Sequence, residues 1–155
     1  MEHLVYCDDK ANVLEKICEG KKRMVVRGAA GRKIPHSRVF AGETLYFMKK
    51  GSKKISAKAV VINVENFVKL NDEEITEKLA ERQELLQLTA TQIKRWQKKC
   101  LCFVTFDQVE EITPMDFDHQ NNMDDWLIVE QIADVVVGTS KPFTYEAAKF
   151  KNKSA

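Results

Sequence analysis

The apolar segments of this chain are mostly short and do not alternate regularly with helices. Hydrophobic periodicity predicts strands over residues 4–7, 23–27, 44–48, 55–64, 101–112 and within 126–138. One helix is predicted between the first two strands, and two more between residues 71 and 96. A parallel doubly wound sheet needs a helix after nearly every strand, so this order argues against one. We therefore expect an α+β fold: a mixed or antiparallel β-barrel with helices packed at its rim.

Local signals refine this order. Helix starts are predicted at polar capping residues, namely Asp8 or Asp9, Asn71 or Asp72, and Thr89 or Thr91. The second helix is expected to bury Ile75, Leu79, Leu85 and Leu86. In the third, Trp96 lies at helical spacing from Ile93, which favours a core position over a stacking role. Val25 is expected at a partly buried rim of its strand.

Length and composition indicate one domain, residues 1–155, in the cytoplasm. The chain has 155 residues, enough for one hydrophobic core. Its apolar runs are too short to span a bilayer, and the first residues do not resemble a signal peptide. Cysteines at positions 7, 18, 100 and 102 lack metal-ligand spacing and are expected to be buried free thiols.

Charge is strongly segregated along the sequence. Residues 20–69 contain thirteen Lys and Arg but only two acids, Glu43 and Glu65. Residues 70–131 contain fourteen Asp and Glu against six Lys and Arg. The net charge of +2 conceals this polarity. A strongly basic segment favours an anionic partner such as RNA, because Lys and Arg bind phosphates without reading sequence.

Within the basic segment, residues 28–38 are predicted to form a loop that contacts nucleic acid. Gly28 and Gly31 allow close backbone approach, and His36 could stack on a base or donate to a phosphate. The basic residues that bracket this loop are Arg27, Arg32, Lys33 and Arg38. The basic stretch at 49–54 is interpreted instead as a solvated hairpin turn. A second basic group surrounds Trp96 and comprises Lys94, Arg95, Lys98 and Lys99.

Gly20, Lys22 and Arg27 follow the first predicted helix with the spacing G-x-K-x-x-x-x-R, and a Gly42-Glu43 turn leads into the next strand. These residues, with the element order over residues 3–112, resemble the ASCH domain, a branch of the PUA-like superfamily. The resemblance implies a β-barrel with a basic cleft that binds RNA or a nucleotide, lined by Lys22 and Arg27. It assigns no place to residues 113–155.

The resemblance also implies a possible catalytic role. Some small ASCH proteins are amidohydrolases that remove an acyl group from acetylated cytidine with a Lys, a Thr and a Glu. Lys22 would be the Lys, with a pKa lowered by burial beside another cation. Val25 stands where the Thr is expected, and only a hydroxyl such as Ser37 or Thr44 could replace it. The Glu would be Glu81 or Glu84, although an exposed helix face explains both.

A loop near the C-terminal end contains four carboxylates and one imidazole that are potential ligands for a cation: Asp116, Asp118, His119, Asp124 and Asp125. It lacks the spacing of a calcium-binding loop, so we expect a solvated connection, no metal and no cofactor.

The sequence thus predicts an RNA- or nucleotide-binding domain without established catalysis. An amidohydrolase of acylated nucleosides is the first alternative. A protein-interaction module, in which the acidic helices dock a basic partner or a second copy, is another. The sequence leaves the oligomeric state open.

Overall fold

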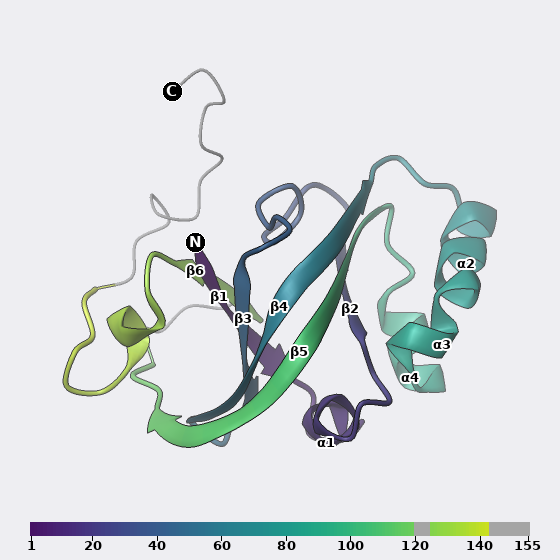
Figure 1. Cartoon of the computed structure of the whole chain (residues 1–155). Helices are drawn as coiled ribbons and strands as arrows, with labels where there is room; N and C mark the ends of the chain where they lie inside the picture. Colours follow the sequence, from purple (N-terminus) through teal and green to yellow (C-terminus); the bar gives the residue numbers. More distant parts are fainter. Residues whose placement is uncertain (120–124, 143–155) are drawn as a thin grey trace.

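The computed structural model describes residues 1–119 and 125–142. Its centre is a six-stranded sheet with the order β2-β5-β4-β3-β1-β6. β1 and β3 run parallel and all other neighbours run antiparallel. The sheet curves into a half-barrel (Figure 1), which confirms the predicted α+β class. The strands are β1 (Glu2–Cys7), β2 (Met24–Ala29), β3 (Thr44–Lys49), β4 (Lys54–Phe67), β5 (Cys100–Asp116) and β6 (Trp126–Val129).

Two long strands, β4 and β5, extend across the whole sheet (Figure 1). They have 14 and 17 residues, and both run further than hydrophobic periodicity predicts. Their pairing shifts register at three places along β4. Such bulges bend and twist a strand pair, which accounts for the strong curvature of the sheet.

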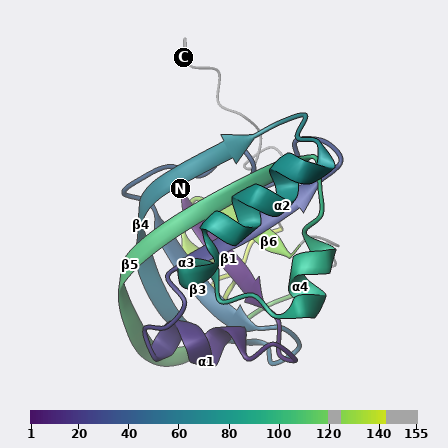
Figure 2. The same ribbon diagram turned by 90° about the vertical axis from the view of Figure 1, so that its right-hand side faces the viewer.

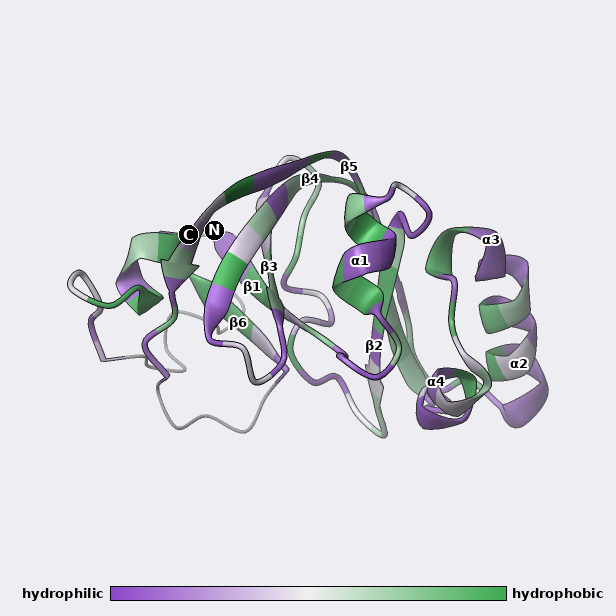
Figure 3. Ribbon diagram, turned by 90° about the horizontal axis from the view of Figure 1, so that it is seen from below, coloured by the Kyte–Doolittle hydropathy of each residue, from purple (hydrophilic) through white to green (hydrophobic). Residues whose placement is uncertain are grey.

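The helices are α1 (Val13–Cys18), α2 (Asp72–Glu81), α3 (Gln83–Leu86) and α4 (Ala90–Arg95), with a 3₁₀ turn, η1 (Ile132–Val135). α2, α3 and α4 lie together against one end of the sheet, beside β2 and β5 (Figure 2). Figure 3 shows polar and apolar residues alternating along α2, as expected of a helix with one buried face. None of the described helices is long and apolar enough to cross a membrane.

Two of the predicted helix starts are confirmed. The side chains of Asn71 and Thr89 accept hydrogen bonds from backbone N–H groups three residues later, in capping boxes. The start predicted for α1 is wrong, because its N-cap is Asn12, a residue with φ of 53°. Instead, the carbonyls of Asp8 and Asp9 accept hydrogen bonds from the backbone N–H groups of Val13 and Asn12, respectively, and form a turn before the helix.

The second predicted helix divides in two at Arg82, whose backbone leaves the helical region. The guanidinium of Arg82 donates to both carboxylate oxygens of Glu65, at 3.0 and 2.9 Å. It also lies 4.7 Å from the ring centroid of Phe103. Arg82 therefore ties the helices to β4 and β5, and Leu86 still becomes fully buried.

β2 separates two parts of the hydrophobic core. Val25 packs inside the half-barrel, whereas Met24 and Val26 pack beneath α2 and α3 against residues such as Leu79 and Leu86. Because both faces are covered, Val25 is only 1% exposed, and the expectation of a partly buried rim position is wrong.

Residues 113–119 and 125–142 complete the other end of the sheet. β5 continues to Asp116, Phe117 forms an isolated bridge with Val136, and β6 pairs antiparallel with β1. The segment that the family resemblance does not place therefore supplies an edge strand. The polar tail at 149–155 lies outside the described residues.

Candidate functional site

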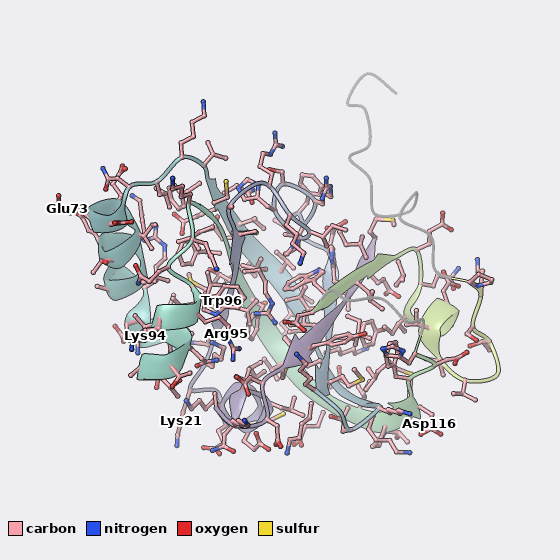
Figure 4. The ribbon with its side chains drawn as sticks, turned by 180° about the vertical axis from the view of Figure 1, so that it is seen from behind. Lys21, Glu73, Lys94, Arg95, Trp96 and Asp116 are labelled. Carbon is pink, nitrogen blue, oxygen red and sulfur yellow. The ribbon has the colours of Figure 1, made fainter. Side chains whose placement is uncertain are left out.

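A pocket of about 510 Å³ lies between α4 and the C-terminal end of β1. Figure 4 shows Arg95 and Trp96 on the side of α4 that turns toward β1. The pocket combines basic, acidic and aromatic side chains from five separate parts of the chain: Tyr6, Asp8, Asp9, Lys10, Arg27, Lys50, Gln92, Arg95, Trp96 and Asp125.

Arg27 connects the two sides of the half-barrel at this pocket. It lies on the edge strand β2, and its Nη2 donates to the carbonyl of Tyr6 on β1 at 2.8 Å. Its Nη1 donates to the carbonyl of Val26, also at 2.8 Å. The guanidinium carbon lies 5.6 Å from the ring centroid of Trp96 and 5.7 Å from that of Trp126. Backbone bonds and aromatic contacts thus fix its orientation.

The charge of Arg27 has no close counter-charge in the described part of the chain. Its Nε is enclosed and makes no hydrogen bond, and no described carboxylate lies within 4.0 Å of the guanidinium. Burial lowers the pKa of Arg27, although arginine remains protonated because its pKa starts above about 12. A half-buried cation without a nearby carboxylate lacks a counter-charge, so an anion at this position would be stabilised.

Two ion pairs cross the rim of the pocket. Arg95 on α4 lies 3.2 Å from Asp8, and Lys50 lies 3.2 Å from Asp125. The lining contains four cationic side chains and three carboxylates. It is therefore close to charge balance, unlike the uniformly basic cleft that the sequence predicts.

The fold brings the segregated charges of the sequence together. β4 and β5 are antiparallel neighbours, so Lys58 faces Glu110 and Lys54 faces Asp116. Lys54 pairs with Asp116, and Lys49 lies 2.6 Å from Glu15. The 49–54 turn, expected to be simply solvated, thus carries several ion pairs, and part of the basic segment is neutralised locally.

Lys22 lies next to this site but does not line the pocket. Its side chain is buried, with 3% exposure, and its amine donates to the carbonyl of Leu86. Burial, followed by the nearby charge of Arg27, lowers the pKa of Lys22 to about 7. The lowered pKa agrees with the predicted desolvation beside another cation, but the amine faces α3.

The loop after β2 contributes no residue to the pocket lining. Arg32 and Lys33 are exposed and Arg38 is half-buried, and none of the three lines the pocket. His36 is buried, with Nε2 3.1 Å from the carbonyl of Phe67 and Nδ1 2.8 Å from Ser37 Oγ. Both ring nitrogens are thus engaged inside the protein, which does not suit the predicted contact with a base or phosphate.

Gly28 also has a role within the protein. A Cβ at Gly28 would lie 2.7 Å from the Leu101 side chain and 2.9 Å from the Cys100 carbonyl. The close approach is therefore between β2 and β5, not between a loop and a ligand. A Cβ at Gly31 would meet no atom within 4 Å.

Solved structures with the same arrangement come from an ASCH protein of Zymomonas mobilis. One matches with a TM-score of 0.57 over 76% of this chain and 74% of that chain. A tyrosine-to-phenylalanine variant of the same protein matches with a TM-score of 0.63, over 84% and 91%. The identity is 13% in both cases. The chain has an ASCH-like fold. No protein-family model matches the sequence, and no curated protein is significantly similar to it.

The groups that amidohydrolysis would need are not gathered on this ASCH-like fold. Val25 is buried in the core, and Glu81 and Glu84 are exposed, in agreement with a solvated helix face. The Ser37 hydroxyl is hydrogen-bonded to the His36 ring, and neither Ser37 nor Thr44 lines the pocket.

Two tryptophans contact Arg27, which the sequence does not indicate. Trp96 is half-buried: it packs against the core cluster beneath the helices and also lines the pocket. The predicted core position is therefore correct for only one side of the ring. Trp126 is missed by sequence reasoning, because only the pairing of β6 with β1 brings it to Arg27.

The acidic loop does not assemble a metal site in the described ranges. Asp116 and Asp125 pair with lysines, and Asp118 accepts a hydrogen bond from Ser140. Asp124 lies outside the described residues. No group of three or more potential ligands is found among the side chains that the structure describes. The cysteines are free thiols, three of them buried and Cys18 half-buried.

Proposed function

We propose that the pocket at Arg27 binds RNA or a free nucleotide through a phosphate group. The single observation that carries this proposal is the half-buried guanidinium of Arg27, which lines the pocket and has no carboxylate within ion-pair distance in the described chain. A phosphate would provide the missing counter-charge and accept from donors that are already oriented.

The neighbouring groups suit the rest of a nucleotide. Trp96 offers an aromatic surface at the pocket wall, on which a base could stack. Arg95 and Lys50 provide further cations at the rim. Lys22 is buried and does not line the pocket, so it is given no direct contact with the phosphate. The loop residues Arg32, Lys33 and Arg38 do not line the pocket, and no part of this proposal rests on them.

Intrinsic fluorescence provides a direct binding assay, because the only two tryptophans of the chain both contact Arg27. A phosphorylated single-stranded RNA hexamer is titrated into wild type, Arg27→Met and Lys58→Met. We expect Arg27→Met to bind at least roughly tenfold more weakly, as for a lost charge-assisted contact. Lys58→Met removes a lysine from β4 outside the pocket and is expected to bind as wild type does.

Arg27 also donates hydrogen bonds to two backbone carbonyls, so its replacement could lower the stability of the fold. Arg95→Gln, at the exposed rim, is the second variant, and circular dichroism checks the folding of each protein. If folded Arg27→Met and Arg95→Gln both bind as tightly as wild type, the pocket is not the binding site.

One observation favours amidohydrolysis of acylated nucleosides as a second candidate. With a pKa of about 7, the amine of Lys22 is partly neutral at physiological pH and could act as a base. Incubation with acetylated cytidine, with Lys22→Met as the control, tests this candidate. Deacylation by wild type and not by the variant would support it, and no turnover above background would exclude it for this substrate.

A further inference from the structure

We infer that the pocket takes one nucleotide by a terminal phosphate monoester, and therefore favours a free mononucleotide or a phosphorylated RNA end over internal RNA backbone. This inference rests on the proposed function and specifies the ligand of the same site.

Arg27 and Arg95 line the same pocket, so a phosphate bound there meets two arginines. No described carboxylate lies within 4.0 Å of the Arg27 guanidinium. Burial has the largest effect on the pKa of Arg27 and lowers it, and among the charged neighbours Asp125 raises this pKa whereas Arg95 lowers it. A phosphate monoester carries a charge of about −1.5 to −2 at pH 7, whereas an internal diester carries about −1. Two arginines therefore match a terminal phosphate better than an internal one.

Arg95 can be released from its ion pair with Asp8 at little cost in free energy. Its partner is Asp8, at 3.2 Å, and the two side chains are 48% and 23% exposed. Exposed ion pairs contribute little to stability. A phosphate bound to Arg27 can therefore replace Asp8 as the partner of Arg95. Asp8 acts as a substitute counter-ion while the pocket is empty, and it opposes anion binding.

Other lysines at this end of the sheet are already paired with carboxylates. Lys50 pairs with Asp125 on the rim, and Lys49 pairs with Glu15 and lies 3.6 Å from Asp9. Asp9 and Asp125 both line the pocket, so their charges disfavour a longer polyanion there. The pocket volume, about 510 Å³, is within the range of about 300–1,000 Å³ that is typical of small-molecule sites.

The first test compares ligands that differ in chain length and terminal phosphate. The probes are adenosine 5′-monophosphate, a 5′-phosphorylated trinucleotide and dodecanucleotide, and the same two oligonucleotides without the phosphate. We expect the terminal phosphate to raise affinity at least roughly tenfold and length to matter little. The plot of log affinity against log salt should have a slope close to about −1, as for one phosphate contact. Binding of the mononucleotide alone indicates a free ligand, whereas binding only of phosphorylated oligonucleotides indicates an RNA end.

The second test uses Asp8→Asn, which keeps the side-chain oxygen that accepts from the backbone of Lys10. Because Arg95 is then no longer held by a carboxylate, phosphorylated probes should bind roughly two- to fivefold more tightly. Asp116→Asn removes one negative charge elsewhere and should have no such effect.

Failure of the inference differs from failure of the proposed function. The inference is overturned if oligonucleotides without a terminal phosphate bind equally well, with affinity that grows with length and a salt slope near about −4. Weaker binding by Asp8→Asn would also overturn it. In both cases RNA binding itself would stand. If no nucleotide or RNA binds, the proposed function falls and the inference with it.

Discussion

The indole Nε1 of Trp126 donates a hydrogen bond to Nδ1 of His3 over 3.0 Å, with both side chains buried. Because an indole can only donate, Nδ1 must be unprotonated. His3 Nε2 then carries the proton and donates to Glu43 over 2.9 Å. The ring of Trp126 also contacts Arg27. The Gly42-Glu43 turn is thus linked to the pocket through two buried rings.

The protonation state of His3 can be measured directly. Nitrogen NMR of labelled imidazole is expected to show the tautomer with the proton on Nε2, because Trp126 requires an acceptor at Nδ1. Trp126→Phe removes the donor and leaves Nδ1 buried without a partner, which should lower the free energy of unfolding by about 1–3 kcal/mol or more. A proton on Nδ1 in wild type would contradict the assignment.

Lys22 should make stability depend on pH. Its pKa is lowered from 10.5 to about 7 in the folded protein, so the unfolded chain binds more protons between those values. Stability therefore rises as pH increases from about 7 toward 10.5. Between pH 7 and 8.5 the gain is about 1.5 kcal/mol, measured by urea unfolding of wild type relative to Lys22→Met. The difference between the two curves would stay constant with pH if Lys22 were normally protonated.

Gly28 should tolerate no side chain. Alanine would place a Cβ against Leu101 and the Cys100 carbonyl, so β2 and β5 must separate locally. We expect Gly28→Ala to lower the free energy of unfolding by about 1–3 kcal/mol, as overpacking usually does. Gly31→Ala is the control, because a Cβ there meets nothing within 4 Å. Equal stability of the two variants would show that the strands can adjust.

Much of the fold can be predicted because its local signals are strong. Capping residues such as Asn71 and Thr89 define helix starts, and alternating apolar residues define most strands. The break at Arg82 could not be predicted, because its cause is a partner on a distant strand, Glu65. The start of α1 was missed for a different, local reason, since Asn12 begins the helix in a left-handed conformation without a side-chain cap.

The candidate site is less accessible from sequence. Arg27 could be found from the spacing of the ASCH motif, but its contacts with Trp96 and Trp126 arise only from tertiary packing. The distribution of charge along the sequence did not predict the charge of the pocket, because Lys50 is paired with Asp125, which follows it by 75 residues. Motif spacing indicates that Arg27 is a candidate site residue, whereas the charges around Arg27 depend on which strands pair.

The most direct test of the account is a titration followed by the two indole N–H resonances, since the chain contains two tryptophans. Adenosine 5′-monophosphate is added to nitrogen-labelled wild type and to Arg27→Met. We expect the Trp96 resonance, and to a smaller extent the buried Trp126 resonance, to move saturably in wild type and to stay fixed in the variant. Saturable shifts in the folded variant equal to those of wild type would contradict the assignment of Arg27 as the phosphate-binding residue.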